Sequence, residues 1–328
     1  MKKNVLIAVA LFATMAVNAQ SIAAVSPSNV TTMYQTLDDA VTKAEEGSVI
    51  YLPGGGFKIS DDTKITKKFT IMGVSHRADA DNADGATVVS GNLSFVGGSS
   101  GSSITGFFLS GSVNVGDSEN PVNNVTIRYC NVNSVQVKNG ASSNLIVNQS
   151  YLRSHSNFGN CNVSLENCVL SSLSNVNGGI INHNIITSSN YYSDYGRCTL
   201  RDVNNSSITN NFFTGWQGHR GGSCTVSNNC IGTGSWSGNE NEIKLDDGTE
   251  WKNVFETPNG ISINSKYKLI GKWGKNAATD GTDVGIYGGS GFNDDKSLAP
   301  IPRIVSKKVD EHTDGSGMLH IEVRVKAD

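Results

Sequence analysis

Apolar positions recur at a regular spacing along the middle of the chain. Seven stretches align on one central apolar residue each, and successive centres are 16 to 27 residues apart. The residue two positions before each centre is small or apolar, and the residue five positions after it is always apolar. Side chains of a strand alternate between its two faces, so the third of these positions cannot share a face with the first two on a straight strand. The centres are Ile104, Ile127, Val147, Leu165, Ile181, Ile208 and Val226.

The pattern therefore requires a bend after each centre. Three positions after the centre, the last three repeats carry Asn184, Asn211 and Asn229. Asparagine tolerates the left-handed conformation of a tight bend, so we predict that Asn211 is a bend residue. Two strands joined by a bend and repeated in this way describe one coil of a solenoid. The three amides are expected to stack as a ladder between neighbouring coils.

The segments on either side of the repeats are expected to cap the two ends of the solenoid. Residues 32–46 have helical apolar spacing, with Thr32 and Gln35 as a capping box, and strands are expected at 49–52 and 68–73. Residues 241 to about 300 predict an irregular C-terminal cap, and 301–328 predict a pair of strands joined by a polar loop.

An apolar stripe lies four positions after the centres, on the face expected to point outward. Its members are Phe108, Asn131, Tyr151, Val169, Ile185, Phe212 and Cys230. A bare stripe of this kind is unfavourable. We predict that the C-terminal segment covers it with Val254, Phe255, Tyr267 and Leu269.

The first 19 residues have the pattern of a secretory signal peptide. Lys2 and Lys3 precede an apolar stretch that is too short to span a membrane, and small residues end at Ala19. We expect cleavage near Ala19 and an exported protein, in the periplasm, at the cell surface or outside the cell. No later stretch has the length and hydropathy of a membrane span.

Composition narrows the partners and cofactors. The formal net charge of −3 argues against a nucleic-acid partner, which requires a basic face. No spacing of His and Cys predicts a zinc site, and no cofactor is expected. Calcium at Asp280 and Asp283 is the alternative, but a turn is favoured there because the regular pattern of a calcium loop is missing. The six cysteines favour buried free thiols over disulfides, and the protein is expected to be a monomer.

Three stretches together resemble the right-handed parallel β-helix proteins of the pectin lyase-like superfamily, of the secreted bacterial type. They are YQTLDDAVTKAEEGSVIYLPGGGFKI with KKFTIMGVS, the I-x-x-N-x-F/I repeats, and YKLIGKWGKNAATDGTDVGIYGG with APIPRI. The resemblance implies an all-β fold in which residues 20–300 form one single-stranded right-handed parallel β-helix with both caps. Many members of this superfamily cut or bind acidic polysaccharides.

The catalytic motifs of that superfamily are missing here. We find neither clustered aspartates on the first strand nor Gly-His-Gly or Arg-Ile-Lys motifs, and between residues 90 and 235 the only acids are Asp117, Glu119, Glu166, Asp194 and Asp202. A glycosidase needs two facing carboxyl groups, and nothing in the sequence places Asp194 and Asp202 together. These two acids, His219 and Arg220 are the weak catalytic candidates.

Two loops differ from the Ser- and Asn-rich remainder of the chain. Residues 190–202 and 215–222 bring aromatic and arginine side chains into neighbouring coils, where they are expected to meet. Aromatic faces stack on sugars and arginine binds carboxylates, so this cluster predicts binding of an acidic polysaccharide without cleavage. A lyase or hydrolase of uronate-containing glycans, and a structural or adhesive surface protein, are the alternatives. The predicted binding residues are Tyr191, Tyr192, Asp194, Tyr195, Arg197, Arg201, Trp216, Gln217, His219 and Arg220.

Overall fold

The computed structural model describes most of the chain after residue 20. The described residues are 21–77, 85–138, 140–187, 190–192, 196–214, 219–232, 235–256, 267–292, 303–310, 312–313 and 315–326. For 190–192, 196–198 and parts of the last two strands, the backbone alone is described.

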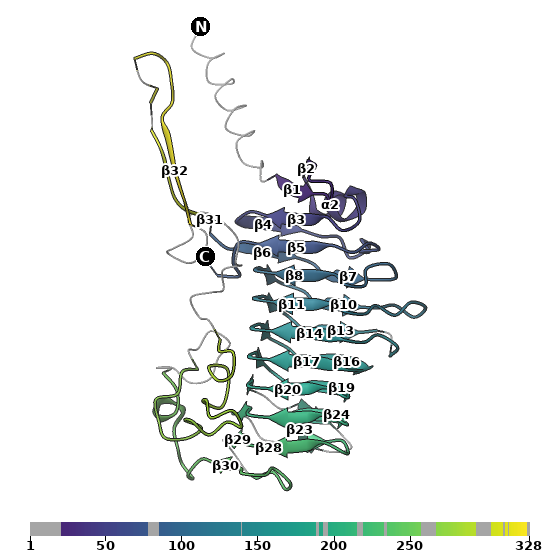
Figure 1. Cartoon of the computed structure of the whole chain (residues 1–328), viewed down its shortest axis with the longest axis vertical. Coiled ribbons are helices and arrows are strands. Elements are labelled where there is room, and N and C mark those ends of the chain that lie inside the picture. The colour runs from purple at the N-terminus through teal and green to yellow at the C-terminus, as the bar shows by residue number, and fades with distance from the viewer. Residues whose placement is uncertain are drawn as a thin grey trace.

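Within these residues the chain forms three long sheets of stacked strands, as in a β-helical solenoid (Figure 1). Sheet A, in spatial order, contains β2 (Thr31–Tyr34), β1 (Ile22–Val25), β3 (Val49–Leu52), β5 (Thr70–Gly73), β8 (Ser103–Thr105), β11 (Thr126–Arg128), β14 (Leu145–Asn148), β17 (Val163–Glu166), β20 (Ile180–Asn182), β25 (Ser207–Thr209) and β28 (Thr225–Ser227). Sheet B contains β4 (Gly55–Lys58), β6 (Thr87–Ser90), β9 (Phe108–Leu109), β12 (Asn131–Val132), β15 (Tyr151–Leu152), β18 (Val169–Leu170), β21 (Ile185–Ile186), β26 (Phe212–Phe213), β29 (Cys230–Ile231) and β30 (Ile243–Lys244). Sheet C contains β7 (Leu93–Phe95), β10 (Val113–Val115), β13 (Val135–Val137), β16 (Ser156–Cys161), β19 (Leu173–Asn177), β24 (Leu200–Asn204) and β27 (His219–Arg220).

Strands of successive coils pair in parallel and in register, so the central apolar residues form one buried column. Ile127 pairs with Ile104 on one side and with Val147 on the other, and Val147 pairs with Leu165. This confirms the predicted stacking. The prediction of two strands per coil was wrong, because the short strands of sheet C form a third side. A strand such as Val113–Val115 supplies only two inward residues, too few to stand out as a periodic signal.

The bend between sheets A and B lies one residue earlier than predicted. The left-handed residues are His183, Asn210 and Asn228, with φ of 53°, 60° and 53°. Asn211 follows the bend instead, and its side chain points into the core, where it is fully buried. The predicted ladder is confirmed: Asn184 Nδ2 donates to Asn211 Oδ1 at 2.9 Å, and Asn211 Nδ2 donates to Asn229 Oδ1 at 3.0 Å.

The ladder supplies partners for backbone groups that the bend leaves unpaired. The backbone N–H groups of Asn184 and Asn211 donate to the amide oxygen of the next coil, at 3.0 and 2.9 Å. Asn229 Nδ2 also donates to Asn239 Oδ1 at 3.1 Å, so the ladder continues one step beyond the repeats recognised in the sequence.

The N-terminal end is closed by a shorter helix than expected. Helix α2 spans Leu37–Lys43, and Thr36 is its N-cap, with the Thr36 hydroxyl accepting from the backbone N–H of Asp39 at 3.1 Å. The predicted capping box at Thr32 and Gln35 was wrong, because Thr31–Tyr34 pairs as strand β2 with β1. Backbone pairing at the sheet edge overrides the helical spacing there. Helix α2 still buries Leu37, Ala40 and Val41 against the first coil.

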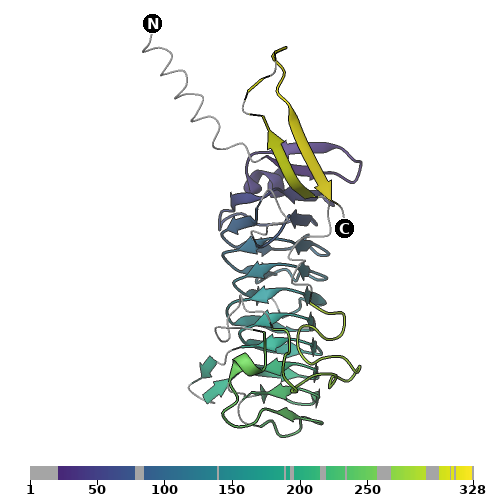
Figure 2. The ribbon, with the colours of Figure 1, turned by 90° about the vertical axis from the view of Figure 1, so that its left-hand side faces the viewer.

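The C-terminal cap covers the outer face of sheet B, as predicted. Val254, Phe255 and Tyr267 are buried in one cluster with the outward column of sheet B. Phe212 packs against Phe255, with ring centroids 4.7 Å apart. Both views show the cap along one side of the last coils (Figures 1 and 2). It includes the 3-10 helix η1 (Trp251–Asn253).

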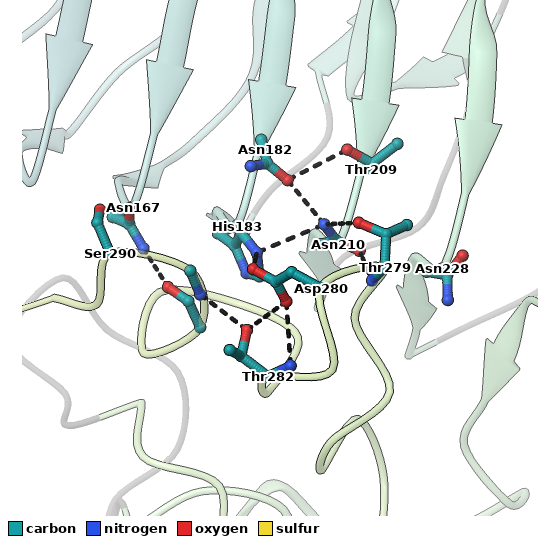
Figure 3. A network of polar contacts seen from close by, with 12 residues as sticks. Asn167, Asn182, His183, Thr209, Asn210, Asn228, Thr279, Asp280, Thr282 and Ser290 are labelled. Carbon is teal, nitrogen blue, oxygen red and sulfur yellow. Dashed lines mark hydrogen bonds and ion pairs between the residues drawn. The ribbon is translucent and has the colours of Figure 1, made fainter.

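A polar seam joins the cap to the left-handed column (Figure 3). Asn210 Nδ2 donates to Thr279 Oγ1 at 2.9 Å, and the Thr279 backbone N–H donates back to Asn210 Oδ1 at 2.8 Å. His183 is buried, with its Nε2 3.3 Å from Asp280 Oδ2. A Cβ atom on Gly288 would lie only 2.4 Å from His183 Nδ1, so the cap needs glycine there to approach the imidazole.

The described cysteine side chains form no disulfide bonds. Cys130, Cys161, Cys168 and Cys230 are buried and Cys224 is partly exposed, whereas the side chain of Cys198 lies outside the described residues. Burial raises the pKa of the Cys130 and Cys168 thiols to about 12, because it disfavours the thiolate.

The last segment forms the predicted pair of strands. β31 (Arg303–Val309) and β32 (Ile321–Lys326) pair antiparallel. Their apolar side chains Val309, Ile321, Val323 and Val325 are more than half exposed. A search of the described residues finds no helix that is long and apolar enough to cross a membrane.

Candidate functional site

The outer face of sheet C carries polar side chains in register from coil to coil. Parallel pairing brings each outward residue next to its equivalent in the next coil, about 4.8 Å away. One column of this face consists of Ser94, Asn114, Gln136, Asn157, Ser174, Arg201 and Arg220. We call this set the sheet C column.

Hydrogen bonds hold several of these side chains in place. Asn114 Nδ2 donates to Ser94 Oγ at 3.2 Å, and Gln136 Nε2 donates to the carbonyl oxygen of His155 at 3.0 Å. Asn175 Nδ2 donates to Asn157 Oδ1 at 3.0 Å. The column is therefore an ordered row of amides and hydroxyls, which is suited to the hydroxyl groups of a sugar chain.

The column ends in two arginines. Arg201 and Arg220 are paired residues of β24 and β27, so their side chains leave neighbouring strands on the same face. Arg201 is half-buried and Arg220 is exposed. The two arginines place positive charge at this end of the face, partly offset by Asp202, and a guanidinium group can bind a carboxylate through paired N–H donors.

Asp202 faces outward beside Arg201 because the strand is irregular there. Its φ of 50° is left-handed, so the two neighbouring residues both leave the core. Arg201 Nε lies 3.0 Å from Asp202 Oδ2, and both side chains are about 40% exposed. This ion pair orients the guanidinium. Asp194, the second carboxylate weighed for glycosidase chemistry, lies outside the described residues.

His219 lies on the other side of the strand from the two arginines. It pairs with Leu200, whose side chain is buried in the core. His219 Nε2 is 3.2 Å from the carbonyl oxygen of Val203, and its ring lies 5.2 Å from that of Trp236. Burial lowers the pKa of His219. Its contacts with Val203 and Trp236 place its side chain in the last coil and not on the outer face of sheet C.

His155 is a polar residue of this face whose position the sequence did not indicate. Its Nδ1 is 3.0 Å from Ser172 Oγ and its Nε2 is 3.0 Å from Ser174 Oγ. Burial lowers the pKa of His155, and the positive charge of Arg201 adds to this effect. Because both imidazole nitrogens are hydrogen-bonded to serine hydroxyls, His155 holds Ser174 of the column in place. The V-x-V strands of sheet C, with Asn114 and Gln136 at their centres, are the signal that could have revealed the column.

The predicted aromatic part of the site is described only in part. Strands β22 (Asn190–Tyr192) and β23 (Gly196–Cys198) form an antiparallel hairpin immediately before β24. The backbone positions of Tyr191, Tyr192 and Arg197 are in this hairpin, next to the arginine end of the column. Asp194, Tyr195, Trp216 and Gln217 lie outside the described residues, so their predicted role stays a prediction.

The described residues show no grouping of three or more His, Cys, Asp or Glu side chains that could hold a metal ion. Asp280, the residue weighed for calcium, instead accepts hydrogen bonds from Thr282 in the polar seam.

In comparisons with known proteins, no family model, no curated protein and no solved structure matches the chain.

Proposed function

We propose that this chain is an exported protein that binds an acidic polysaccharide along the outer face of sheet C, without cleaving it. The observation that supports this most strongly is the sheet C column, in which ordered amides and hydroxyls lead to the paired Arg201 and Arg220. A linear glycan presents hydroxyl groups at regular intervals, and a uronate adds a carboxylate that the arginines can bind.

The solenoid geometry suits a long ligand. A rigid stack of coils holds its outward side chains at fixed spacing, so binding costs little conformational entropy of the protein. We propose that the coil is right-handed, because parallel strands of a twisted sheet are almost always connected in that sense. Tyr191 and Tyr192 belong to the hairpin β22–β23, which directly precedes the strand of Arg201, and Trp216 precedes Arg220 by four residues in the sequence. We propose that sugar rings stack on these aromatic side chains.

Export is part of the proposal. It rests on the charged and apolar pattern of residues 1–19. We propose cleavage near Ala19 and a mature monomer outside the cytoplasm.

A screen of immobilised acidic and neutral polysaccharides tests the proposal. Immobilised uronate-rich glycans should retain the protein, and they should not retain the double variant Arg201→Gln/Arg220→Gln. Arg128→Gln, an exposed arginine on sheet A, is the matched control and should bind like the unmodified protein. Binding should also weaken as salt is added, because charge pairs at a surface are screened.

The same screen separates the alternatives. Elimination by a lyase would create an unsaturated uronate that absorbs in the ultraviolet, and hydrolysis would create new reducing ends. If none of the immobilised glycans retains the protein, the proposal is contradicted and an adhesive protein with a protein partner is favoured.

A further inference from the structure

One asparagine interrupts the apolar stripe on the outer face of sheet B. Asn131 stands between Phe108 and Tyr151 in a column that continues through Val169 and Ile185. Its side chain is 92% buried, and its Oδ1 atom has no hydrogen-bond partner. A buried acceptor without a partner costs about 1–3 kcal/mol. A leucine at position 131 would avoid that cost, so packing alone does not explain why the residue is asparagine.

A second unpartnered acceptor lies beside the same tyrosine. His76 is 94% buried, and its ring centroid is 5.4 Å from that of Tyr151. Its Nδ1 lies 3.1 Å from the carbonyl oxygen of Tyr129, which can only accept, so Nδ1 carries the proton. Burial lowers the pKa of His76 to about 3, with a further contribution from Arg77, so the ring is neutral. Its Nε2 therefore presents a lone pair, and this atom too is buried without a partner.

Two arginines border these acceptors. Arg77 Nη2 donates to Tyr151 Oη at 2.6 Å, with its guanidinium 5.2 Å from the tyrosine ring. Arg153 lies over the ring of Phe108 at 4.4 Å and donates to the carbonyl oxygen of Leu109 at 2.6 Å. Arg153 Nε is buried and unpartnered. Among the described residues, no carboxylate forms an ion pair with either arginine.

Aromatic side chains complete the surroundings. Phe292 of the C-terminal cap packs edge-on against Tyr151, with ring centroids 5.5 Å apart. We call the set formed by His76, Arg77, Phe108, Asn131, Tyr151 and Arg153 the Asn131 cluster.

We propose that the Asn131 cluster binds one small hydroxylated carboxylate of the uronic-acid class, at a site separate from sheet C. The two guanidinium groups exclude a cation and favour a carboxylate. The two unpartnered acceptors require a ligand that also donates, which a hydroxyl group does and an anion without a proton, such as chloride or sulfate, does not. The aromatic rings offer apolar surface to the C–H face of a sugar. The proposal does not depend on polysaccharide binding at sheet C.

Titration calorimetry of the protein with D-galacturonate and with D-glucuronate tests this. At least one should bind saturably, whereas acetate, which lacks hydroxyls, and glucose, which lacks the carboxylate, should bind at least about tenfold more weakly. Arg77→Gln should weaken uronate binding at least about tenfold.

Asn131→Leu separates binding from folding. The substitution removes the unpartnered acceptor from an apolar stripe, so it should abolish uronate binding while leaving the melting temperature without ligand unchanged or higher. Asn148→Leu, on the outer face of sheet A, is the matched control and should bind normally. The double variant at Arg201 and Arg220 should also bind the monosaccharide normally, which keeps this test apart from that of the sheet C face.

Nitrogen NMR of the His76 imidazole is a second readout that needs no substitution. A ligand hydroxyl that donates to Nε2 should shift that resonance, whereas Nδ1 should stay near its free value. If the folded protein binds neither uronate, or if Asn131→Leu binds as well as the unmodified protein, the proposal is wrong and the acceptors serve only ordered water.

Discussion

Sheets B and C belong to the same coils, yet the outer face of sheet B is apolar and covered, whereas that of sheet C is polar. The outward column of sheet B is apolar from Tyr151 to Cys230 and is buried under the C-terminal cap. The outward column of sheet C carries amides, hydroxyls and two arginines; its amides and arginines are partly or fully exposed, whereas Ser94 and Ser174 are buried. The fold fixes the spacing of both columns, so the identity of the outward residues decides which face the cap covers and which face stays polar.

Among substitutions that test this contrast, one on the covered face of sheet B should change the free energy of unfolding most. Phe212→Ala removes a fully buried ring that packs against Phe255 and Trp251. We expect a loss of about 3–5 kcal/mol in the free energy of unfolding, from lost burial and the cavity left behind. Denaturant unfolding measures this. Asn114→Ala on sheet C is the control and should change stability by less than about 0.5 kcal/mol. Equal effects at the two sites would contradict the contrast.

The asparagine ladder gives a smaller effect in the interior. Asn211→Ala removes the acceptor of the Asn184 backbone N–H and leaves buried polar groups without partners. We expect a loss of about 2–3 kcal/mol in unfolding free energy. Asn162 makes a similar amide pair with Asn144, but in an exposed turn. Asn162→Ala should therefore cost much less, and a comparable cost would show that burial does not set the strength of these ladders.

The polar seam predicts a modest dependence on pH. Hydrogen bonds from Thr282, with a smaller contribution from His183, hold the pKa of Asp280 below its ordinary value of 3.8. The ionised carboxylate therefore stabilises the docked cap fully above the unfolded pKa, and this contribution is lost as the pH falls through the folded pKa. Melting temperatures of the protein and of Asp280→Asn should differ at neutral pH and converge in acid. A difference that persists below the folded pKa would contradict this assignment.

The sequence predicted the repeat and its covered face because both depend on apolar periodicity. The column through Ile127, Val147 and Leu165 and the covering of Phe212 by Phe255 follow from which residues need burial. The bend was placed one residue late because Asn210 and Asn211 are chemically identical. The left-handed position and the inward position therefore cannot be told apart from composition alone.

The site was predictable only where charge is scarce. Arg201 and Arg220 stand out in an uncharged background, and the structure does bring them together. The sheet C column escaped notice because Asn114 and Gln136 belong to three-residue strands, in which two inward valines give no period to recognise. The sequence did not show that His219 pairs with the buried Leu200 while Arg220 pairs with Arg201, because a short strand gives no indication of which of two adjacent residues faces the core.

The most direct test of the functional account is the affinity of a uronate oligosaccharide, measured by calorimetry for variants on different faces. Arg201→Gln/Arg220→Gln should reduce the affinity at least about tenfold without changing the melting temperature, because both side chains lie outside the core. Arg128→Gln on sheet A should leave the affinity unchanged. If the double variant on sheet C binds the oligosaccharide as tightly as the Arg128→Gln control, the outer face of sheet C is not the binding surface.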